Sequence, residues 1–326
     1  MSVDELVGSE FGERAAAQLA EIEAALSSWA SADTPFVDEA AHHIIAAGGK
    51  RFRPMLVVAT AGLYPDSDPA AVEKAAVAVE LTHVASLYHD DVMDEADYRR
   101  GAESANHRWR NNVAILVGDF LFARASGVVA ELGAGYVQVH AETFARLVQG
   151  QIAETRGPQP GDDPVAHYLQ VIADKTGSLI AASAKYGGMV GGAPASDLEA
   201  LSAFGEELGV VFQLSDDVID LAGSATGKTP GTDLREGVLT LPTLMLLASD
   251  DPADDELKSR LRGPIVDEDV LSDTLSRVLA HRVVDEARAE IARRAEVARG
   301  YLTGLPDGEA KDALSALCDS VTTRTA

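Results

Sequence analysis

Apolar residues recur at spacings of three and four along almost the whole chain, which is the period at which one face of an α-helix returns. Alanine, the strongest helix former, is abundant, and strict alternation of apolar and polar residues is rare. The pattern therefore predicts an all-α protein. The expected helices cover residues 5–30, 35–47, 53–64, 69–94, 111–131, 135–156, 163–186, 195–222, 239–249, 254–262, 267–275, 279–303 and 307–322.

Glycine and proline mark the expected loops. Several expected helices exceed twenty residues, a length typical of helical bundles, whose core can hold a ligand between facing helices. The loop clusters are short and have apolar helices on both sides, so we expect residues 1–326 to form a single domain, a bundle of long helices around a central active-site cavity. The clusters cover residues 65–69, 157–164, 187–194, 223–237, 263–264 and 304–308.

The composition narrows the class of protein. Hydrophobic residues make up 46% and charged residues 24%, which is typical of globular proteins. The net charge of -25 argues against nucleic-acid partners and anionic membrane surfaces. Cys318 is the only cysteine, which excludes an intrachain disulfide and fits a reducing compartment. Because we find neither a signal-peptide pattern nor a membrane span, we expect a cytoplasmic protein.

Two Asp-Asp-x-x-Asp motifs each end a long apolar segment. The first and last aspartates of such a motif share a helix face, where their like charges repel and the helix dipole is unfavourable for them. Magnesium would offset this cost, since it binds one or two carboxylates together with substrate phosphates. We interpret the motifs as magnesium sites that would hold a diphosphate. Their aspartates are Asp90, Asp91, Asp94, Asp216, Asp217 and Asp220.

A third match to the same pattern, residues 250–254, serves as an internal control. Pro252 and polar surroundings predict a loop or a helix start there. A single such motif in so acidic a chain could equally be a solvated helix end. Two motifs inside long apolar helices favour the metal site.

Further motifs surround the two aspartate motifs between about residues 46 and 243. With these motifs, in this order and spacing, the chain resembles the trans-isoprenyl diphosphate synthases of the polyprenyl synthetase family. The motifs are Gly48-Gly49-Lys50-Arg51-Phe52-Arg53-Pro54, His83, Arg99-Arg100-Gly101, Gly118-Asp119, Gly150-Gln151, Lys175-Thr176-Gly177, Gln213, Gly227-Lys228 and Gly231-Thr232-Asp233.

The resemblance implies an all-α fold of the isoprenoid synthase type, usually a homodimer, that joins isopentenyl diphosphate to an allylic diphosphate. It implies about three Mg²⁺ ions per active site, bound by Asp90, Asp94 and Asp216, with Asp91, Asp217 and Asp220 in support. The residues implied to bind the allylic diphosphate are Arg99, Lys175, Thr176, Gln213 and Lys228, with Asp233 also in the substrate-binding set. Those implied for isopentenyl diphosphate are Lys50, Arg53, His83 and Arg100. Catalysis would depend chiefly on Asp90, Asp94, Asp216, Lys175 and Lys228.

The residue chemistry agrees with this assignment. Arginine forks and lysine charges suit diphosphate oxygens, and a basic cluster in so acidic a chain is unusual for a random surface patch. Cations would stabilise the departing diphosphate while the isopentenyl double bond attacks the allylic carbocation. This reaction needs no protein nucleophile, and the sequence offers no convincing one.

Two positions bear on the product and on substrate contacts. Ala85 and Ser86 precede the first aspartates by one helical turn, where a bulky aromatic residue closes the cavity in short-product members of the family. We therefore expect a product of about thirty to fifty carbons; Phe120, Phe122 or Leu132 could still set the floor, and the small pair could instead only ease helix packing. Val238 stands where many relatives carry lysine, so Lys228 would act alone or with Arg235.

Four other functions remain open. A geranylgeranyl or farnesyl diphosphate synthase would differ only in product length. A class I terpene cyclase usually has a different second metal motif and needs no second diphosphate site. A non-catalytic subunit of a heteromeric synthase tends to lose aspartates, which are intact here. A lipid-diphosphate binding protein would differ only by showing no turnover.

Overall fold

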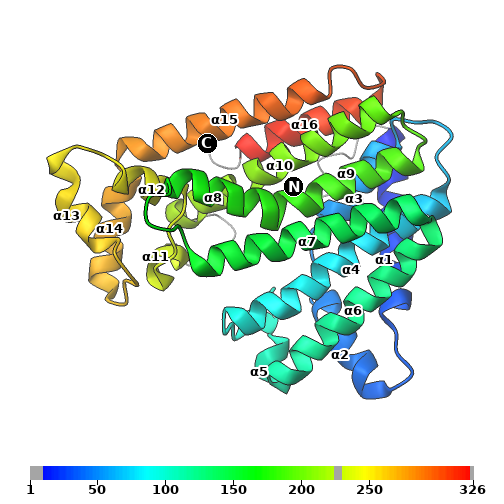
Figure 1. Cartoon of the computed structure of the whole chain (residues 1–326), viewed down its shortest axis with the longest axis horizontal. Helices are drawn as coiled ribbons and strands as arrows, with labels where there is room; N and C mark the ends of the chain where they lie inside the picture. The colour runs from blue at the N-terminus through cyan, green and yellow to red at the C-terminus, as the bar shows by residue number, and fades with distance from the viewer. Residues whose placement is uncertain (1–9, 224–229, 324–326) are drawn as a thin grey trace. The chain divides into compact units, whose positions relative to one another are not determined.

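The computed structural model describes residues 10–223 and 230–323 (Figure 1). Lys228, predicted to bind the allylic diphosphate, lies outside the described residues. The first half of the chain contains α1(Glu10–Ala30), α2(Pro35–Ala46), α3(Phe52–Ala61), α4(Pro69–Met93), β1(Tyr98–Arg99), β2(Ala102–Glu103), α5(Ala105–Trp109), α6(Asn111–Leu132) and α7(Ala134–Arg156). The second contains α8(Pro164–Ile172), η2(Ala173–Gly177), α9(Ser178–Val190), α10(Ala195–Ala222), α11(Thr232–Glu236), α12(Leu241–Leu247), η3(Pro252–Asp254), α13(Asp255–Arg260), α14(Glu268–Leu279), α15(Arg282–Tyr301) and α16(Glu309–Thr323).

The contacts divide the chain into two compact units, each built from separate stretches of sequence. The first comprises residues 1–145, 179–205 and 304–314, and the second comprises 146–178, 206–303 and 315–326. Helices α7, α10 and α16 contribute to both units. The all-α prediction is confirmed, whereas the single domain and its central cavity remain predictions.

Helix α4 is the centre of the first unit. It packs most extensively against α6, and also against α3 and α1 (Figure 1). Pro69 occupies its first turn, and the Asp68 side chain caps it by accepting a hydrogen bond from the backbone N–H of Ala70. Because α4 is buried on nearly all sides from Ala75 to Tyr88, the polar residues at its C-terminal end are held on a rigid support.

Gly187 lets α9 approach α3 closely within the first unit. A Cβ atom there would lie 2.0 Å from Thr60 Oγ1 and 2.4 Å from the Val57 carbonyl oxygen. Our prediction of a loop over 187–194 is thus wrong in its first part, because Gly187 and Gly188 lie inside α9 and serve helix packing.

We expect Gly187→Ala to lower the free energy of unfolding by about 3 kcal/mol, since neither the α3 backbone nor the hydrogen-bonded Thr60 can move away at low cost. Gly127→Ala in α6 is the matched control, because a Cβ atom there meets no atom within 4 Å. The control should be neutral or slightly stabilising. Urea unfolding of both variants measures the difference, and equal stabilities would contradict the close approach.

Short elements account for the other differences from the expected helices. The hairpin of β1 and β2 and the five-residue helix α5 lie between two expected helices, where no element was predicted, and the five-residue helix α11 lies within the expected loop over 223–237. Elements this short fall below the window over which helical periodicity can be recognised. In addition, the helix expected over 163–186 is interrupted by the π-helical turn η2.

Among the described residues, only α6 is long and apolar enough to cross a membrane by length and composition. Its contacts with α4 explain this apolar character, because the buried face of α6 forms part of the core of the first unit. Core helices and membrane spans satisfy the same criterion, so α6 is weak evidence for a span.

Candidate active site

The aspartates of the first motif point in different directions at the C-terminal end of α4. Asp91 is completely buried, Asp90 is half-buried, and Asp94, which ends the helix, is exposed. The backbone N–H of Asp94 donates to the carbonyl oxygen of Asp90 at 2.8 Å, which continues the helical turn. Asp90 and Asp94 therefore form an outward-facing pair, whereas Asp91 faces the core of the unit.

Asp91 holds Arg99, one of the residues predicted to bind the allylic diphosphate. The Arg99 Nε and Nη2 atoms both lie 2.6 Å from Asp91 Oδ1. Burial raises the pKa of Asp91, and the Arg99 guanidinium opposes that shift. Strand β1, which carries Arg99, is thus fixed to the end of α4.

A basic cluster surrounds the connection between α2 and α3 in the same unit. Arg51 is neutralised by two carboxylates, with Nε 2.5 Å from Glu23 Oε2 and Nη1 3.1 Å from Glu80 Oε1. A Cβ atom at Gly49 would lie 2.9 Å from the guanidinium groups of both Arg51 and Arg100. The glycine therefore allows the two arginine side chains to pack against the backbone.

Arg53 and His83 make this cluster electropositive. The Arg53 Nε atom is buried and has no hydrogen-bond partner among the described residues. Burial lowers the pKa of Arg53 to about 10; Glu80 opposes this shift and Arg100 adds to it. Burial and the neighbouring Arg53 and Arg100 also lower the pKa of His83 well below its ordinary value, so its ring is neutral at pH 7.

The two other residues predicted to bind isopentenyl diphosphate are Arg100, which is hydrogen-bonded to the backbone, and Lys50. Arg100 donates to the carbonyl oxygens of Ile44, at 3.4 Å, and Gly48, so it satisfies the end of α2. Lys50 is exposed. The first unit therefore brings Arg53, His83 and Arg100 into one cluster at the α2–α3 connection.

The second motif repeats the arrangement of the first at the end of α10, in the other unit. Asp216 and Asp220 are half-buried, whereas Asp217 is only 3% exposed. Asp217 accepts hydrogen bonds from the Tyr168 hydroxyl and from Gln213 Nε2, the latter at 3.4 Å. Burial raises the pKa of Asp217 to about 7, against the lowering effect of these hydrogen bonds.

The predicted diphosphate residues Lys175 and Thr176 lie in the π-helical turn η2 of the same unit. Such turns are frequent at functional sites. Lys175 Nζ pairs with Glu154 Oε2 at 2.6 Å, and the Thr176 hydroxyl donates to Gln213 Oε1 at 3.4 Å. A Cβ atom at Gly150 would lie 2.7 Å from the Lys175 backbone nitrogen, so this glycine permits the contact between α7 and the turn.

Asp220 connects the second motif to the next segment of the chain. Its Oδ2 atom accepts a hydrogen bond from the Asp233 N–H at 3.1 Å, and its carbonyl oxygen accepts one from Gly231 at 2.9 Å. Two of the residues predicted from the sequence, Asp220 and Asp233, are thus adjacent. Together with Asp217, Gln213, Thr176 and Lys175, they belong to the second unit.

Val238 lines an apolar pocket in this unit, where many relatives would place a lysine. The pocket has a volume of about 590 Å³, and its walls include Tyr168, Val171 and Leu244. Arg235, the alternative cation suggested by the sequence, pairs with Glu268. Val238 therefore supplies no cation, and Arg235 is already paired with an acidic residue.

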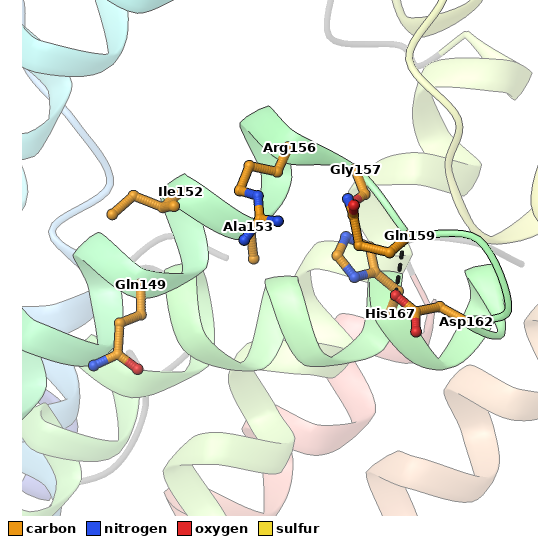
Figure 2. A pocket seen from close by; sticks show the side chains of 8 residues that line it. All are labelled: Gln149, Ile152, Ala153, Arg156, Gly157, Gln159, Asp162 and His167. Carbon is orange, nitrogen blue, oxygen red and sulfur yellow. Dashed lines mark hydrogen bonds between the residues drawn. The ribbon is translucent and has the colours of Figure 1, made fainter.

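A second pocket of about 240 Å³ lies at the connection between α7 and α8 (Figure 2). The Gln159 backbone N–H donates to Asp162 Oδ2 at 2.8 Å beside it. None of the residues predicted for substrate or metal binding lines this pocket, so we assign it no role in the reaction.

The control motif behaves as the sequence indicates. Pro252–Asp254 form a short 3₁₀ helix, and Asp251 caps it by accepting a hydrogen bond from the Ala253 N–H. The Asp254 carboxylate accepts hydrogen bonds from Ser249 and His281. Its carboxylates therefore have local structural roles.

Two residues of these sites were missed by the sequence analysis. Glu80 is 2% exposed, and an acidic residue within the apolar run of α4 is a signal of a buried ion pair. Tyr168 lies seven residues before Lys175, but nothing in the sequence identifies its partner. The side chain of Arg51, the partner of Glu80, is 11% exposed.

The carboxylates suit an open magnesium site better than a closed one. In residues 10–223 and 230–323, no group of three or more histidine, cysteine, aspartate or glutamate side chains is arranged to enclose an ion. Magnesium typically retains waters and is completed by substrate phosphates. Outward-facing pairs such as Asp90 with Asp94 fit that mode of binding.

Helix-end carboxylate pairs and a buried basic cluster on an all-α scaffold are the features of a metal-dependent enzyme that acts on diphosphates. The chain belongs to the polyprenyl synthetase family, whose model matches residues 34–277. It is 46% identical, over 86% of its length and 85% of the relative, to nonaprenyl diphosphate synthase from Mycobacterium tuberculosis. It is thus a prenyltransferase, as the sequence predicted.

Solved structures give the same result. Geranylgeranyl pyrophosphate synthase from Corynebacterium glutamicum, in complex with calcium and isoprenyl diphosphate, superimposes with a TM-score of 0.88 at 42% identity, covering 98% of each chain. Decaprenyl diphosphate synthase from Rhodobacter capsulatus has a TM-score of 0.86 at 33% identity, covering 97% of this chain and 98% of its own. The isoprenoid-synthase fold class is confirmed.

Proposed function

We propose that this chain is a long-chain trans-polyprenyl diphosphate synthase, which condenses isopentenyl diphosphate with an allylic diphosphate to a product of about forty to fifty carbons. The observation that carries the proposal is the half-buried basic cluster around Arg53, whose Nε atom is buried, in the same unit as the outward-facing Asp90 and Asp94. A buried guanidinium nitrogen without a hydrogen-bond partner is costly unless an anion completes it.

The carboxylates of both motifs serve one reaction in this proposal. Asp90, Asp94 and Asp216 would bind Mg²⁺, about three ions in all, with Asp220 in support. When bound, magnesium supplies positive charge to the diphosphate that leaves the allylic substrate. The buried Asp91 and Asp217 would contribute to substrate binding indirectly, because their carboxylates hold Arg99 and Gln213.

The two substrates would use different cations. Lys50, Arg53, His83 and Arg100 would bind isopentenyl diphosphate, and the neutral His83 ring can donate one hydrogen bond to it. Arg99, Lys175, Thr176, Gln213 and Lys228 would bind the allylic diphosphate, and Asp233 would also belong to the substrate-binding set. These groups would stabilise charge on the leaving diphosphate while the isopentenyl double bond attacks the allylic carbon. Loss of a proton from the resulting carbocation restores a double bond, and no covalent enzyme intermediate is needed.

Incubation with radiolabelled isopentenyl diphosphate, Mg²⁺ and each allylic primer in turn tests the function, with chromatography of the dephosphorylated products. The proposal expects a ladder ending at about forty to fifty carbons. A product of twenty carbons would make the chain a geranylgeranyl diphosphate synthase. A cyclic hydrocarbon would indicate a terpene cyclase, and absence of turnover would indicate a binding protein or a non-catalytic subunit.

We expect Ala85→Phe to shorten the product. Ala85 is fully buried and lies one turn before Asp90, so an aromatic ring there would obstruct the growing chain. The added volume should also cost about 1–3 kcal/mol of stability. Ala85→Ser is the size-matched control and should leave the product ladder unchanged. An unchanged ladder for the phenylalanine variant would mean that another side chain sets the length.

The homodimer and the cytoplasmic location also belong to this proposal. Ile115 and Leu116 on α6 are 40% and 66% exposed, and Val137 on α7 is 44% exposed. Large apolar side chains exposed on the same helical turn, such as Ile115 and Leu116, favour association with a second copy. The single buried cysteine, Cys318, fits a reducing compartment.

A further inference from the structure

A chain of polar contacts connects α8, the π-helical turn and α10 in the second unit. It begins at the Tyr168 hydroxyl, which donates to Asp217 Oδ2. Asp217 Oδ1 accepts from Gln213 Nε2 at 3.4 Å, and Gln213 Oε1 accepts from the Thr176 hydroxyl at 3.4 Å. Gln213 and Thr176 are residues that the proposed function assigns to the allylic diphosphate, whereas Tyr168 has no assigned role.

The carboxylate of Asp217 is directed toward other side chains of the protein. It is 3% exposed, and both of its oxygens accept hydrogen bonds from side chains of the same unit. The half-buried Asp216 and Asp220 lie four residues apart and share a helix face, from which Asp217 is rotated by about 100°. The position of the Asp217 carboxylate therefore depends on the side chains that donate hydrogen bonds to it.

The direction of each hydrogen bond fixes the orientation of the Gln213 amide. The Gln213 amino group faces Asp217 and the Gln213 carbonyl oxygen faces Thr176, because Asp217 Oδ1 accepts from Gln213 Nε2 and the Thr176 hydroxyl donates to Gln213 Oε1. One amide N–H is used by Asp217, and the second is left to donate elsewhere. A rigid amide with a remaining donor is suited to an oxygen of a bound diphosphate.

We propose that Tyr168 is a positioning residue for the allylic diphosphate: its hydrogen bond to Asp217 fixes the orientation of Gln213 and, through it, of Thr176. The inference rests on the proposed function, because it concerns substrate contacts of that reaction. Without the Tyr168 hydroxyl, Asp217 Oδ2 would lose its side-chain donor, and the carboxylate would keep its hydrogen bond from the Leu241 backbone. The carboxylate would then shift toward other donors, and the amide would lose its fixed orientation.

Tyr168→Phe tests the role with little change in shape. We expect the KM for the allylic diphosphate to rise about tenfold, as is typical for the loss of a hydrogen bond to a charged group. The KM for isopentenyl diphosphate should stay within about twofold, since its proposed ligands lie in the other unit. The matched control is Tyr186→Phe, which removes another buried tyrosine hydroxyl, 3.0 Å from the Tyr136 carbonyl oxygen.

A double-mutant cycle separates positioning from general stability. Asp217→Asn alone and together with Tyr168→Phe should give nearly the same KM for the allylic substrate, because both changes break one network. If Asp217→Asn does not fold, Gln213→Leu takes its place in the cycle. Additive effects, or a fall in thermal stability with both KM values unchanged, would overturn the inference.

The outcomes also separate this inference from the proposed function. If the wild-type chain turns over both substrates and Tyr168→Phe matches it, the positioning role is wrong and the function stands. A rise in the Mg²⁺ concentration needed for half-maximal rate, with KM unchanged, would make Asp217 a metal ligand and would also overturn the role. If the wild-type chain shows no turnover, the proposed function itself fails.

Discussion

Replacing Asp90 or Asp216 with alanine is expected to lower kcat by about a hundredfold to a thousandfold, which corresponds to about 3–4 kcal/mol of transition-state stabilisation. Each residue is half-buried at the end of a long helix and belongs to a carboxylate pair four residues apart. Without magnesium, such a pair repels itself at the negative end of the helix dipole. Alanine should therefore leave the fold intact or slightly stabilised while it removes a metal ligand.

Asp250→Ala supplies the control, because Asp250 opens the third Asp-Asp-x-x-Asp match and is exposed in a loop. Its rate should equal that of the wild-type chain. Steady-state kinetics over a range of Mg²⁺ concentrations, with circular dichroism of each variant, measures the difference. A near-normal rate for Asp90→Ala or Asp216→Ala would remove that residue from the metal site and leave the motif as a solvated helix end.

The fold could be predicted closely because the helices are long. Helical periodicity accumulates over many turns, so α4, α7 and α10 end within a few residues of their expected bounds. The short helices α5 and α11 and the β1–β2 hairpin provide too few residues for a periodic signal. Gly187 was misinterpreted because glycine marks both turns and close helix contacts, and only tertiary structure distinguishes them.

The types of residue in the candidate site could be predicted from the sequence, but the contacts between those residues could not. Local spacing separates Asp91 from Asp90 and Asp94 around the helix, yet which residue turns toward the core depends on the elements packed there. The pairing of Asp91 with Arg99 and of Asp217 with Tyr168 joins segments that are distant in the sequence or separated by a turn. One sequence has no signal for such contacts.

Replacing Arg53 with methionine is expected to raise the KM for isopentenyl diphosphate about a hundredfold and to increase thermal stability at the same time. The loss of affinity follows from removing a charged donor to a diphosphate. The gain follows from burial, which lowers the pKa of Arg53 to about 10 and leaves its Nε atom without a hydrogen-bond partner in the described part of the chain. Because the folded state disfavours the charged form of Arg53, removing that charge should stabilise the protein by about 1–3 kcal/mol.

The pH dependence identifies the cause of that gain. Since the folded-state pKa of Arg53 is lowered from its ordinary value, the cost of burying the charged form is fully present below pH 10 and decreases as the pH rises through about 10. The stability difference between Arg53→Met and the wild-type chain should therefore be constant from about pH 6 to 9.

Arg51→Met is the matched control for this prediction, because it changes the same residue type in the same cluster. Arg51 is paired with Glu23 and with the buried Glu80, so its removal leaves Glu80 without that partner and should cost about 3–5 kcal/mol. Denaturant unfolding of both variants, with kinetics for each substrate, makes the comparison. If Arg53→Met were as destabilising as Arg51→Met, Arg53 would be a structural residue, and the basic cluster would no longer support a diphosphate site.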